Sequence, residues 1–250
     1  MAVIWQQQRN GNHYEVRTHG ASVRLYTNGV FHTQWNPRDP LKGSLWELLL
    51  LPAFFRPPAQ VRRVLLLGVG GGALVRLLQT YCSPDQILGV DIDPVHLSVA
   101  KRFFEVRGVE LVCADARTVV ADLTAGDAPP FDLVVDDLFG HVDGEAERAF
   151  AADPEWCEAI LALVGPAGMV VSNFGSRGEL LASGWRTPGI SAQLAAPGGS
   201  WTLDHPDYEN CIGVFSRIPL DRNDLKLHAP AVLNPGNPAR KMDARIRALR

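Results

Sequence analysis

The hydrophobic and polar positions follow two different patterns along the chain, and the first covers its N-terminal part. Residues 13–35, HYEVRTHGASVRLYTNGVFHTQW, alternate and are rich in Val, Tyr, Thr and Phe, with turn signals at Gly20 and Gly29. Alternation predicts half-buried strands, and an Asn-Gly pair between alternating runs is a strong hairpin signal. The segment therefore predicts a small β-meander, followed by a short helix over 41–51 that ends at Pro52.

From residue 63 onward, short apolar runs alternate with amphipathic stretches. The apolar runs predict strands over 64–68, 87–91, 110–113, 133–136 and 168–173. The amphipathic stretches predict helices near 72–81, 94–105, 116–122 and 153–164. Near-continuous apolar strands that alternate with helices are typical of a parallel sheet covered on both faces.

Two later strands, around 190–194 and 211–216, have no convincing helix between them, so we expect an antiparallel pair that closes the sheet edge. The sequence thus predicts an α/β fold with a Rossmann-like, seven-stranded, mostly parallel sheet whose last strand is antiparallel. We divide the chain into the meander and helix (1–57), an adenosyl-binding domain (58–219) and a C-terminal extension (220–250). The basic end of the extension, ARKMDARIRALR, predicts a solvated helix.

Composition and charge narrow the class of function. The net charge is -3, which gives no global attraction to nucleic acid or to an anionic membrane. We find no signal-peptide pattern and no apolar run near the ~18 residues that span a bilayer, so we expect a cytoplasmic protein. The four cysteines and seven histidines are scattered without ligand spacing, which predicts reduced thiols and no metal site.

The first candidate site is a glycine cluster after the first parallel strand. Gly68, Gly70, Gly71 and Gly72 precede Ala73, where a helix pattern begins. Glycines permit a tight turn and close approach of the backbone to a ligand, and a helix N-terminus adds N–H donors. The pattern G-x-G-x-x-A also fits a dinucleotide site, and the alternative is a turn needed only for packing.

Acidic residues follow the next two strands. Asp91 ends the second strand, 23 positions after Gly68, near the spacing of about 20 that is typical of an acid that binds ribose hydroxyls. Asp93 precedes a proline and is expected to cap a helix. Asp115 can accept from an adenine amino group, with the Ala116 N–H facing the ring, and the competing interpretation is again a helix cap.

Asp136 and Asp137 end the fourth strand, and Asn173 occupies the same level on the fifth. In open α/β sheets, ligands bind outside the carboxyl ends of the strands. Adjacent carboxylates there suit a cationic sulfonium or the deprotonation of a nucleophile, whereas the alternative is a pair of solvated loop acids. His141, in the expected lid over 138–152, is a second candidate base.

Together these residues resemble the spermidine synthase family, within the class I S-adenosylmethionine-dependent methyltransferase superfamily. The resemblance spans about Tyr14 to Arg217 and includes LLLGVGGGALVR, GVDIDPVHLSVAKRFF, CADAR and FDLVVDDLF. It implies ribose binding by Asp91, adenine binding by Asp115, Asp137 at the reacting centre, and a homodimer. The predicted cofactor-binding set is Gly68, Gly70, Gly71, Gly72, Asp91, Ile92, Asp115, Ala116 and Asp136, and the predicted substrate set is His32, Glu47, His141 and Asn173.

The sequence departs from that family at three specialised positions. Aminopropyltransferases have G-G-G-D-G-G in the glycine loop, where the Asp holds the free amine of decarboxylated S-adenosylmethionine, and this chain has Gly71 there. The second Asp of their D-S-S-D motif is Gly140, and a Gln of their meander is His32. The positions expected to bind the adenosyl group remain.

These departures favour methyl transfer from intact S-adenosylmethionine to a small-molecule acceptor. The intact cofactor carries a carboxylate, which an Asp in the loop would repel and which backbone N–H groups at Gly71 would suit. A polyamine needs several acids when it is buried, and the 138–140 segment offers Leu, Phe and Gly.

Three alternatives to a methyltransferase stay open. They are an aminopropyltransferase that uses decarboxylated S-adenosylmethionine, a nicotinamide-dependent oxidoreductase, and a non-catalytic adenosyl-binding protein. The acids in CADAR and VDD and the closing hairpin argue against the nicotinamide enzyme, and Asp137 argues for chemistry.

Overall fold

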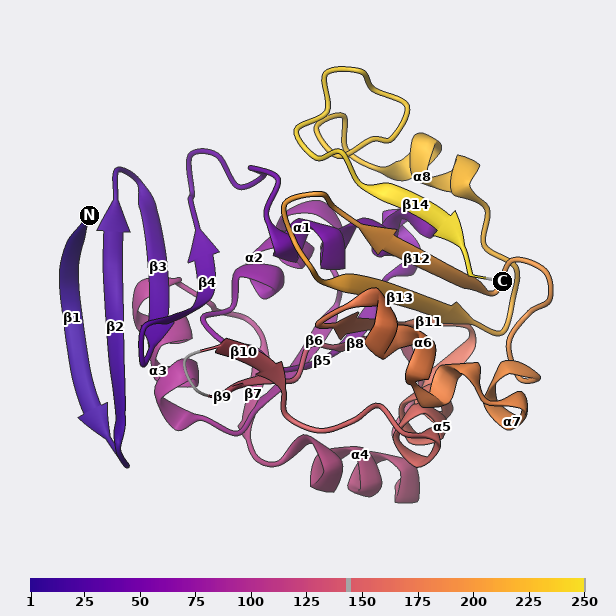
Figure 1. Cartoon of the computed structure of the whole chain (residues 1–250), viewed down its shortest axis with the longest axis horizontal. Coiled ribbons are helices and arrows are strands. Elements are labelled where there is room, and N and C mark those ends of the chain that lie inside the picture. Colours follow the sequence, from indigo (N-terminus) through magenta and orange to yellow (C-terminus); the bar gives the residue numbers. More distant parts are fainter. Residues whose placement is uncertain (143–144, 250) are drawn as a thin grey trace.

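A computed structural model describes residues 1–142 and 145–249. The chain begins with a four-stranded antiparallel sheet in the order β1-β2-β3-β4 (Figure 1). Its strands are β1 (Ala2–Arg9), β2 (Asn12–His19), β3 (Ser22–Thr27) and β4 (Val30–Trp35). The predicted meander is confirmed, and the turn at Asn28 and Gly29 adopts positive φ. The sequence did not predict β1, because almost all of its residues are exposed and show no alternation of burial.

The central sheet has eight strands in the order β14-β12-β13-β11-β8-β5-β6-β7. Five adjacent strands, from β11 to β7, are parallel, and β13 runs antiparallel to β11, as expected. The strands are β5 (Arg63–Leu67), β6 (Gln86–Asp91), β7 (Glu110–Cys113), β8 (Phe131–Asp136), β11 (Val164–Phe174), β12 (Ser200–Asp204), β13 (Cys211–Ser216) and β14 (Arg245–Ala248). The Rossmann-like α/β prediction is therefore confirmed, with eight strands in place of seven.

The strand expected over 190–194 was wrong. This segment follows Pro188, which opens the short helix α7 (Pro188–Ser191), because proline has a φ suited to the first helical position. The hairpin partner of β13 is β12, in the segment that we expected to be only a connection. The antiparallel closing pair itself is confirmed.

The terminal helix was also wrong, because the basic end forms β14 on the free edge of β12. Ile246 is buried, whereas Arg245 and Arg247 are exposed and lie within ion-pair distance of Asp204. An unpaired strand edge offers backbone groups that pair readily with another strand, and this pairing overrides a local helix preference.

Helices cover both faces of the central sheet. On one face lie α1 (Leu45–Leu50), the 3₁₀ turn η1 (Leu51–Phe55), α2 (Ala73–Tyr81) and α3 (Pro94–Phe103), and on the other α4 (Ala116–Ala125), α5 (Pro154–Ala162), α6 (Arg177–Ala182) and α7. The remaining helical elements are η2 (Pro58–Gln60), η3 (Gly184–Arg186) and α8 (Arg222–His228). No helix in the described ranges is long and apolar enough to cross a membrane.

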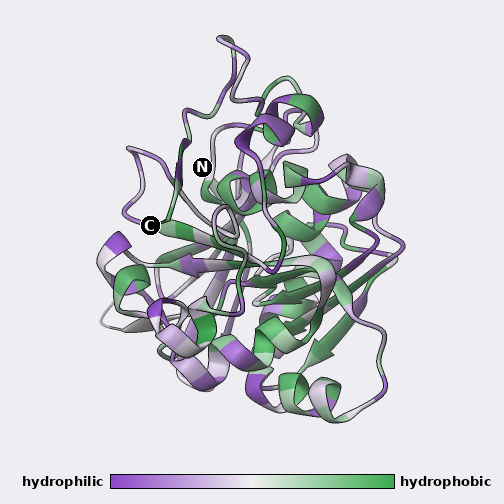
Figure 2. Ribbon diagram, turned by 90° about the vertical axis from the view of Figure 1, so that its right-hand side faces the viewer, coloured by the Kyte–Doolittle hydropathy of each residue, from purple (hydrophilic) through white to green (hydrophobic). Residues whose placement is uncertain are grey.

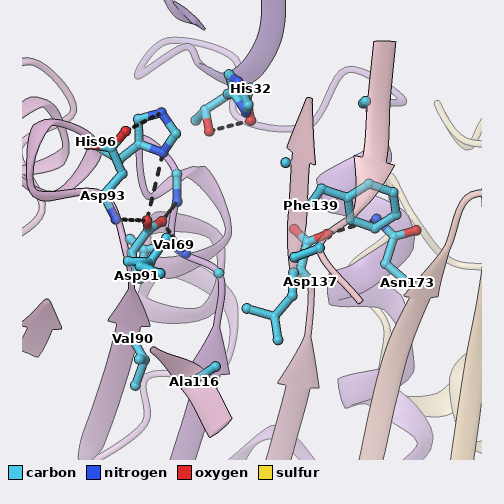
Figure 3. Close-up of a pocket in the computed structure, with 18 of the residues that line it drawn as sticks. His32, Val69, Val90, Asp91, Asp93, His96, Ala116, Asp137, Phe139 and Asn173 are labelled. Atoms are coloured by element: carbon cyan, nitrogen blue, oxygen red, sulfur yellow. Dashed lines mark hydrogen bonds and ion pairs between the residues drawn. The ribbon is translucent and has the colours of Figure 1, made fainter. Parts of the chain in front are cut away.

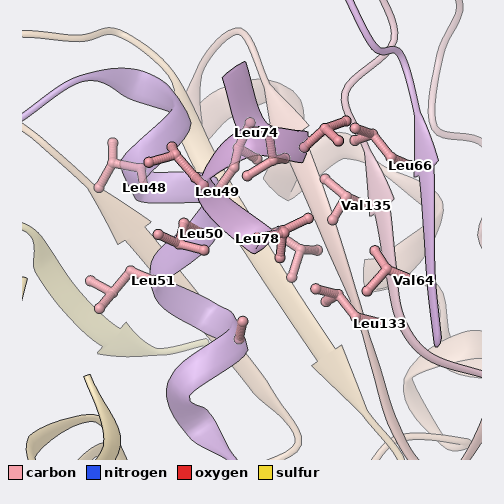
Figure 4. Packing of buried hydrophobic residues seen from close by; sticks show 14 of the residues in the cluster. Leu48, Leu49, Leu50, Leu51, Val64, Leu66, Leu74, Leu78, Leu133 and Val135 are labelled. Carbon is pink, nitrogen blue, oxygen red and sulfur yellow. The ribbon is translucent and has the colours of Figure 1, made fainter. Parts of the chain in front are cut away.

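Strand β5 shows how the two cores form. Val64 and Leu66 pack into one hydrophobic cluster, and Leu65 and Leu67 pack into the other. Figure 2 shows the strands of the central sheet largely in the hydrophobic colour. The apolar run Leu48–Leu51 packs with α2 against β5 and β8 (Figure 4), so it covers the sheet.

A glycine brings the ends of β5 and β8 together. Gly68 has φ +91, and a Cβ added there would lie 2.0 Å from the Asp137 carbonyl oxygen. The Asp137 N–H donates to the Leu67 carbonyl at 2.8 Å. A side chain at Gly68 would therefore separate the two strand ends that carry the candidate site.

A hairpin of β9 (Phe139–Val142) and β10 (Glu145–Arg148) follows β8. Arg148 anchors it, because its Nη2 donates to Asp136 Oδ2 at 3.0 Å and both side chains are almost fully buried. Trp156 Nε1 donates to the same carboxylate oxygen at 3.3 Å. The prediction that Asp136 binds cofactor was wrong, because successive strand residues point to opposite faces and Asp136 faces away from the cavity described below.

We expect Arg148→Met to lower the free energy of unfolding by about 3–5 kcal/mol, because it leaves the Asp136 carboxylate buried without its partner. The double variant Asp136→Asn/Arg148→Met should recover most of that loss. Arg247→Met, which breaks an exposed pair with Asp204, is the control and should cost no more than about 1 kcal/mol. Urea unfolding measures all four proteins, and a single Arg148→Met variant as stable as the wild type would contradict the anchor.

Candidate functional site

A cavity of about 500 Å³ opens at the carboxyl ends of β5, β6 and β8. The N-terminal sheet, the starts of α1, α3 and α4, the β9–β10 hairpin and the segments at the end of β11 and before β13 also contribute to its lining. In Figure 3, Asp91, Asp93 and His96 face Asp137, Phe139 and Asn173 across the open space. The volume falls within the range of small-molecule sites.

The Asp91 carboxylate organises one side of the cavity. Its Oδ2 accepts from the N–H groups of Val69 at 3.0 Å and Gly70 at 2.8 Å. Its Oδ1 accepts from the Asp93 N–H at 2.9 Å. The structure therefore brings Asp91 and the glycine loop together, as the sequence predicted, and Gly68, Gly70 and Ile92 also line the cavity.

His96 is a cavity residue that the sequence analysis missed. Its Nε2 lies 2.9 Å from Thr27 Oγ1, and its Nδ1 lies 3.8 Å from Asp91 Oδ1. Burial disfavours the charged imidazole, but the carboxylates of Asp91 and Asp93 outweigh it and raise the pKa of His96. Burial likewise opposes ionisation of Asp91, whose pKa is nevertheless lowered by His96 and by backbone donors. The sequence did contain a sign that His96 lies near this acidic group, because Asp93 and His96 are spaced i, i+3 at the start of α3 and therefore lie on the same side of the helix.

Asp115 and Ala116 line the cavity beyond Ile92. Asp115 Oδ1 accepts from the Arg117 N–H at 2.8 Å and so caps α4, as the competing interpretation had it. The Arg117 guanidinium hydrogen-bonds the same carboxylate and lowers the pKa of Asp115. The Arg117 guanidinium also lies 5.0 Å from the ring centroid of Phe150, another lining residue. The helix-cap role leaves Asp115 at the cavity wall, so adenine binding stays a prediction.

On the opposite side, Asp137 heads a chain of hydrogen bonds. Asn173 Nδ2 donates to Asp137 Oδ1 at 2.8 Å, and Asn210 Nδ2 donates to Asn173 Oδ1 at 3.0 Å. Burial raises the pKa of Asp137 to about 6, and the nearby Asp136 charge adds to it while the Asn173 hydrogen bond opposes it. Asn210 was missed because it precedes β13, which runs antiparallel to β11 and therefore starts beside the carboxyl end of β11.

Besides Asp136, three described residues of the predicted sets, Glu47, Gly71 and Gly72, do not line the cavity. Glu47 is fully buried, and its carboxylate accepts from the N–H groups of Lys42, Gly43 and Ser44 at 2.6, 2.7 and 3.1 Å. Glu47 therefore caps α1, which corrects its place in the predicted substrate set. The capping box Ser44-x-x-Glu47 was readable in the sequence.

Gly71 is the second correction, and Gly72 likewise lies behind the cavity wall. The Gly71 N–H donates to Thr33 Oγ1 at 2.9 Å, so it is not directed at a bound anion. A Cβ at Gly71 would lie 2.9 Å from the Phe104 ring, and one at Gly72 would lie 2.5 Å from Val106 Cγ2. Both glycines are needed for packing. His32 lines the cavity, whereas the His141 side chain lies outside the described residues.

Comparison with known proteins agrees with this fold. Residues 64–153 match the family model described as a methyltransferase domain. A polyamine aminopropyltransferase 2 from Caldanaerobacter subterraneus subsp. tengcongensis is 30% identical over 112 residues, which cover 43% of this chain and only 36% of that relative.

The solved structures extend the likeness to nearly the whole fold. A probable spermidine synthase from Corynebacterium glutamicum aligns with a TM-score of 0.71 at 15% identity and covers 99% of this chain and 91% of its own. Spermidine synthase from Thermotoga maritima aligns at 0.64 with 16% identity, covering 91% and 78%. Human methyltransferase-like protein 13 in complex with SAH aligns at 0.55 with 20% identity, covering 72% and 85%. The chain thus has the class I methyltransferase-like fold, with a methyltransferase domain match at residues 64–153, and its resemblance to the spermidine synthases is confirmed.

Proposed function

We propose that this protein transfers the sulfonium methyl group of S-adenosylmethionine to a small-molecule acceptor, with Asp137 as the base. The observation that carries the proposal is the partly buried Asp137 carboxylate, whose pKa is about 6, in the same cavity as Asp91. A carboxyl group with this pKa is mostly ionised at neutral pH and is a stronger base than an ordinary aspartate.

The residues on the Asp91 side fit an adenosyl group. The two Asp91 oxygens have about four acceptor sites and receive three backbone N–H groups, so capacity remains for a ribose hydroxyl. Ile92 is 71% exposed beside it and offers apolar surface to a base. Asp91, Ile92, Asp115 and Ala116 would hold the nucleoside. The related human structure contains SAH, and a related spermidine synthase structure contains the analogue AdoDATO.

The bound cofactor would supply an electrophilic carbon on sulfur and depart as a neutral thioether. Asp137 would orient the acceptor's nucleophilic atom and take its proton. Asn173 holds Oδ1 of Asp137, which leaves Oδ2 as the oxygen for that proton. Holding the two reactants in line would supply most of the rate enhancement, because such a leaving group needs little acid catalysis.

Two observations favour methyl over aminopropyl transfer. The loop position that would hold a free amine is Gly71, which packs against Phe104 too closely for a larger side chain. The carboxylate adjacent to Asp137 in the sequence is Asp136, which pairs with Arg148 and is therefore not available to an acceptor ammonium group. The Gly71 N–H, which we expected to bind the carboxylate of the intact cofactor, donates to Thr33 instead and does not support this proposal.

Aminopropyl transfer is the second candidate. The matched polyamine aminopropyltransferase and the spermidine synthase structures support it, because the resemblance to the latter extends to the N-terminal sheet. A decarboxylated cofactor and a polyamine acceptor would then replace the intact cofactor and the acceptor proposed here.

Calorimetric titration separates the two candidates. We expect S-adenosylmethionine to bind about tenfold or more tightly than its decarboxylated form, and NAD not to bind. Asp91→Ala should weaken binding about tenfold or more, whereas Asp122→Ala, an exposed acid on α4 outside the cavity, should not. Tighter binding of the decarboxylated form would establish the aminopropyl alternative instead.

Asp137→Asn separates binding from chemistry. It should lower turnover about 10²-fold or more with any acceptor that the wild type uses, because the amide cannot take the proton. Its cofactor affinity should stay within about threefold of the wild-type value. Product analysis by mass spectrometry measures the first quantity and calorimetry the second; full turnover in the variant would remove Asp137 from the chemistry.

A further inference from the structure

We infer that the acceptor is a neutral aromatic molecule that presents one phenol-like hydroxyl to Asp137. This inference rests on the proposed function, and it names the substrate class of the same cavity. Its basis is the set of side chains that line the cavity away from Asp91, which we call the acceptor chamber: Phe31, Trp46, Phe139, Asp137, Asn173 and Asn210.

The walls of the acceptor chamber are aromatic and come from three separate elements. Phe31 on β4 packs edge-to-face with Trp46 on α1, with ring centroids 5.4 Å apart. Phe139 on β9 lines the same part of the cavity as Asp137 and Asn173, and Figure 3 draws it on their side. Flat apolar rings prefer to contact other rings through offset or edge-to-face geometry, and these three can do so with an aromatic ligand.

The chamber is also connected as a unit. Tyr208 Oη donates to the Gly43 carbonyl at 3.3 Å, which ties the loop before β13 to the segment before α1. This contact therefore links the segment that carries Asn210 to the segment that leads to Trp46.

Charge then decides between a neutral acceptor and a polyamine. Within the described residues, the cavity is lined by the carboxylates of Asp91, Asp93, Asp115 and Asp137. Asp91 and Asp93 share His96, and Asp115 pairs with Arg117. Of these four carboxylates Asp137 is the one in the acceptor chamber, and its hydrogen-bond partner there is the neutral Asn173 amide.

A polyamine would bring two or more ammonium groups into the acceptor chamber, where Asp137 is the carboxylate available to them. Burying an ammonium without a carboxylate is costly, and contact with an aromatic face compensates only partly. A neutral aromatic acceptor brings no such charge. Its other polar atoms would meet the amides of Asn173 and Asn210, which are neutral as well.

The proposed step is balanced. The phenolic O–H bond breaks, and its proton moves to the Asp137 carboxylate. The oxygen forms a bond to the methyl carbon as the carbon–sulfur bond breaks, and that electron pair stays on sulfur. The products are the methyl ether, S-adenosylhomocysteine and protonated Asp137, which returns its proton to water.

The test uses the full chain with S-adenosylhomocysteine and neutral phenols, headed by 2-naphthol, against putrescine and spermidine. We expect at least one of the phenols to bind the complex about tenfold or more tightly than either polyamine. Trp46→Ala should weaken phenol binding about tenfold with unchanged affinity for S-adenosylhomocysteine. Trp5→Ala is the matched control, because Trp5 is also half-buried but does not line the cavity.

Each outcome decides. Tighter binding of a polyamine, no phenol binding, or phenol binding that ignores Trp46→Ala overturns the inference about the acceptor. If phenols bind through Trp46 but S-adenosylhomocysteine does not bind, the acceptor chamber stands and the proposed function fails. If S-adenosylhomocysteine binds and the phenols do not, the proposed function stands and the acceptor class is wrong.

Discussion

The end of strand β8 places two adjacent carboxylates on opposite faces of one sheet, and the candidate site depends on this division. Asp136 points into the core, where Arg148 and Trp156 bind it, and so fixes the hairpin that lines the cavity. Asp137 points into the cavity, where burial raises its pKa and one amide holds it. One acid therefore serves structure, and the other remains available as a base.

Asp91 plays the complementary part on the next-but-one strand. Its two oxygens tie the glycine loop after β5 to the turn before α3, and His96 links it to Thr27 of the N-terminal sheet. The glycine loop, the turn before α3 and the N-terminal sheet are thus connected through one carboxylate. This arrangement explains why the N-terminal sheet is part of the cavity wall, although it is separate from the central sheet.

Sequence reasoning worked where local pattern and sheet topology suffice. The apolar runs located β5 to β8, and the rule that ligands bind at the carboxyl ends of parallel strands brought Asp91, Asp137 and Asn173 to one cavity. It failed for Asp136 and Glu47 because a carboxylate in the right region was assumed to face the ligand. Strand alternation and a capping box, both visible in the sequence, direct these two side chains away from the cavity.

Sequence reasoning also failed where a contact with a distant part of the chain determines the outcome. The Gly71 N–H donates to Thr33, β14 pairs with the edge of β12, and Asn210 reaches the site from the segment before an antiparallel strand.

The most direct test of this account is the ionisation of Asp137 itself. Titration of its carboxyl carbon by NMR, with Asp137→Asn used for assignment, should give a pKa of about 6. Because burial disfavours the charged form, that carboxyl should ionise well above the range of exposed aspartates, and turnover should fall as the pH drops through the same value. A carboxyl that titrates near 4, with turnover unchanged between pH 7 and 5, would contradict the role given to Asp137.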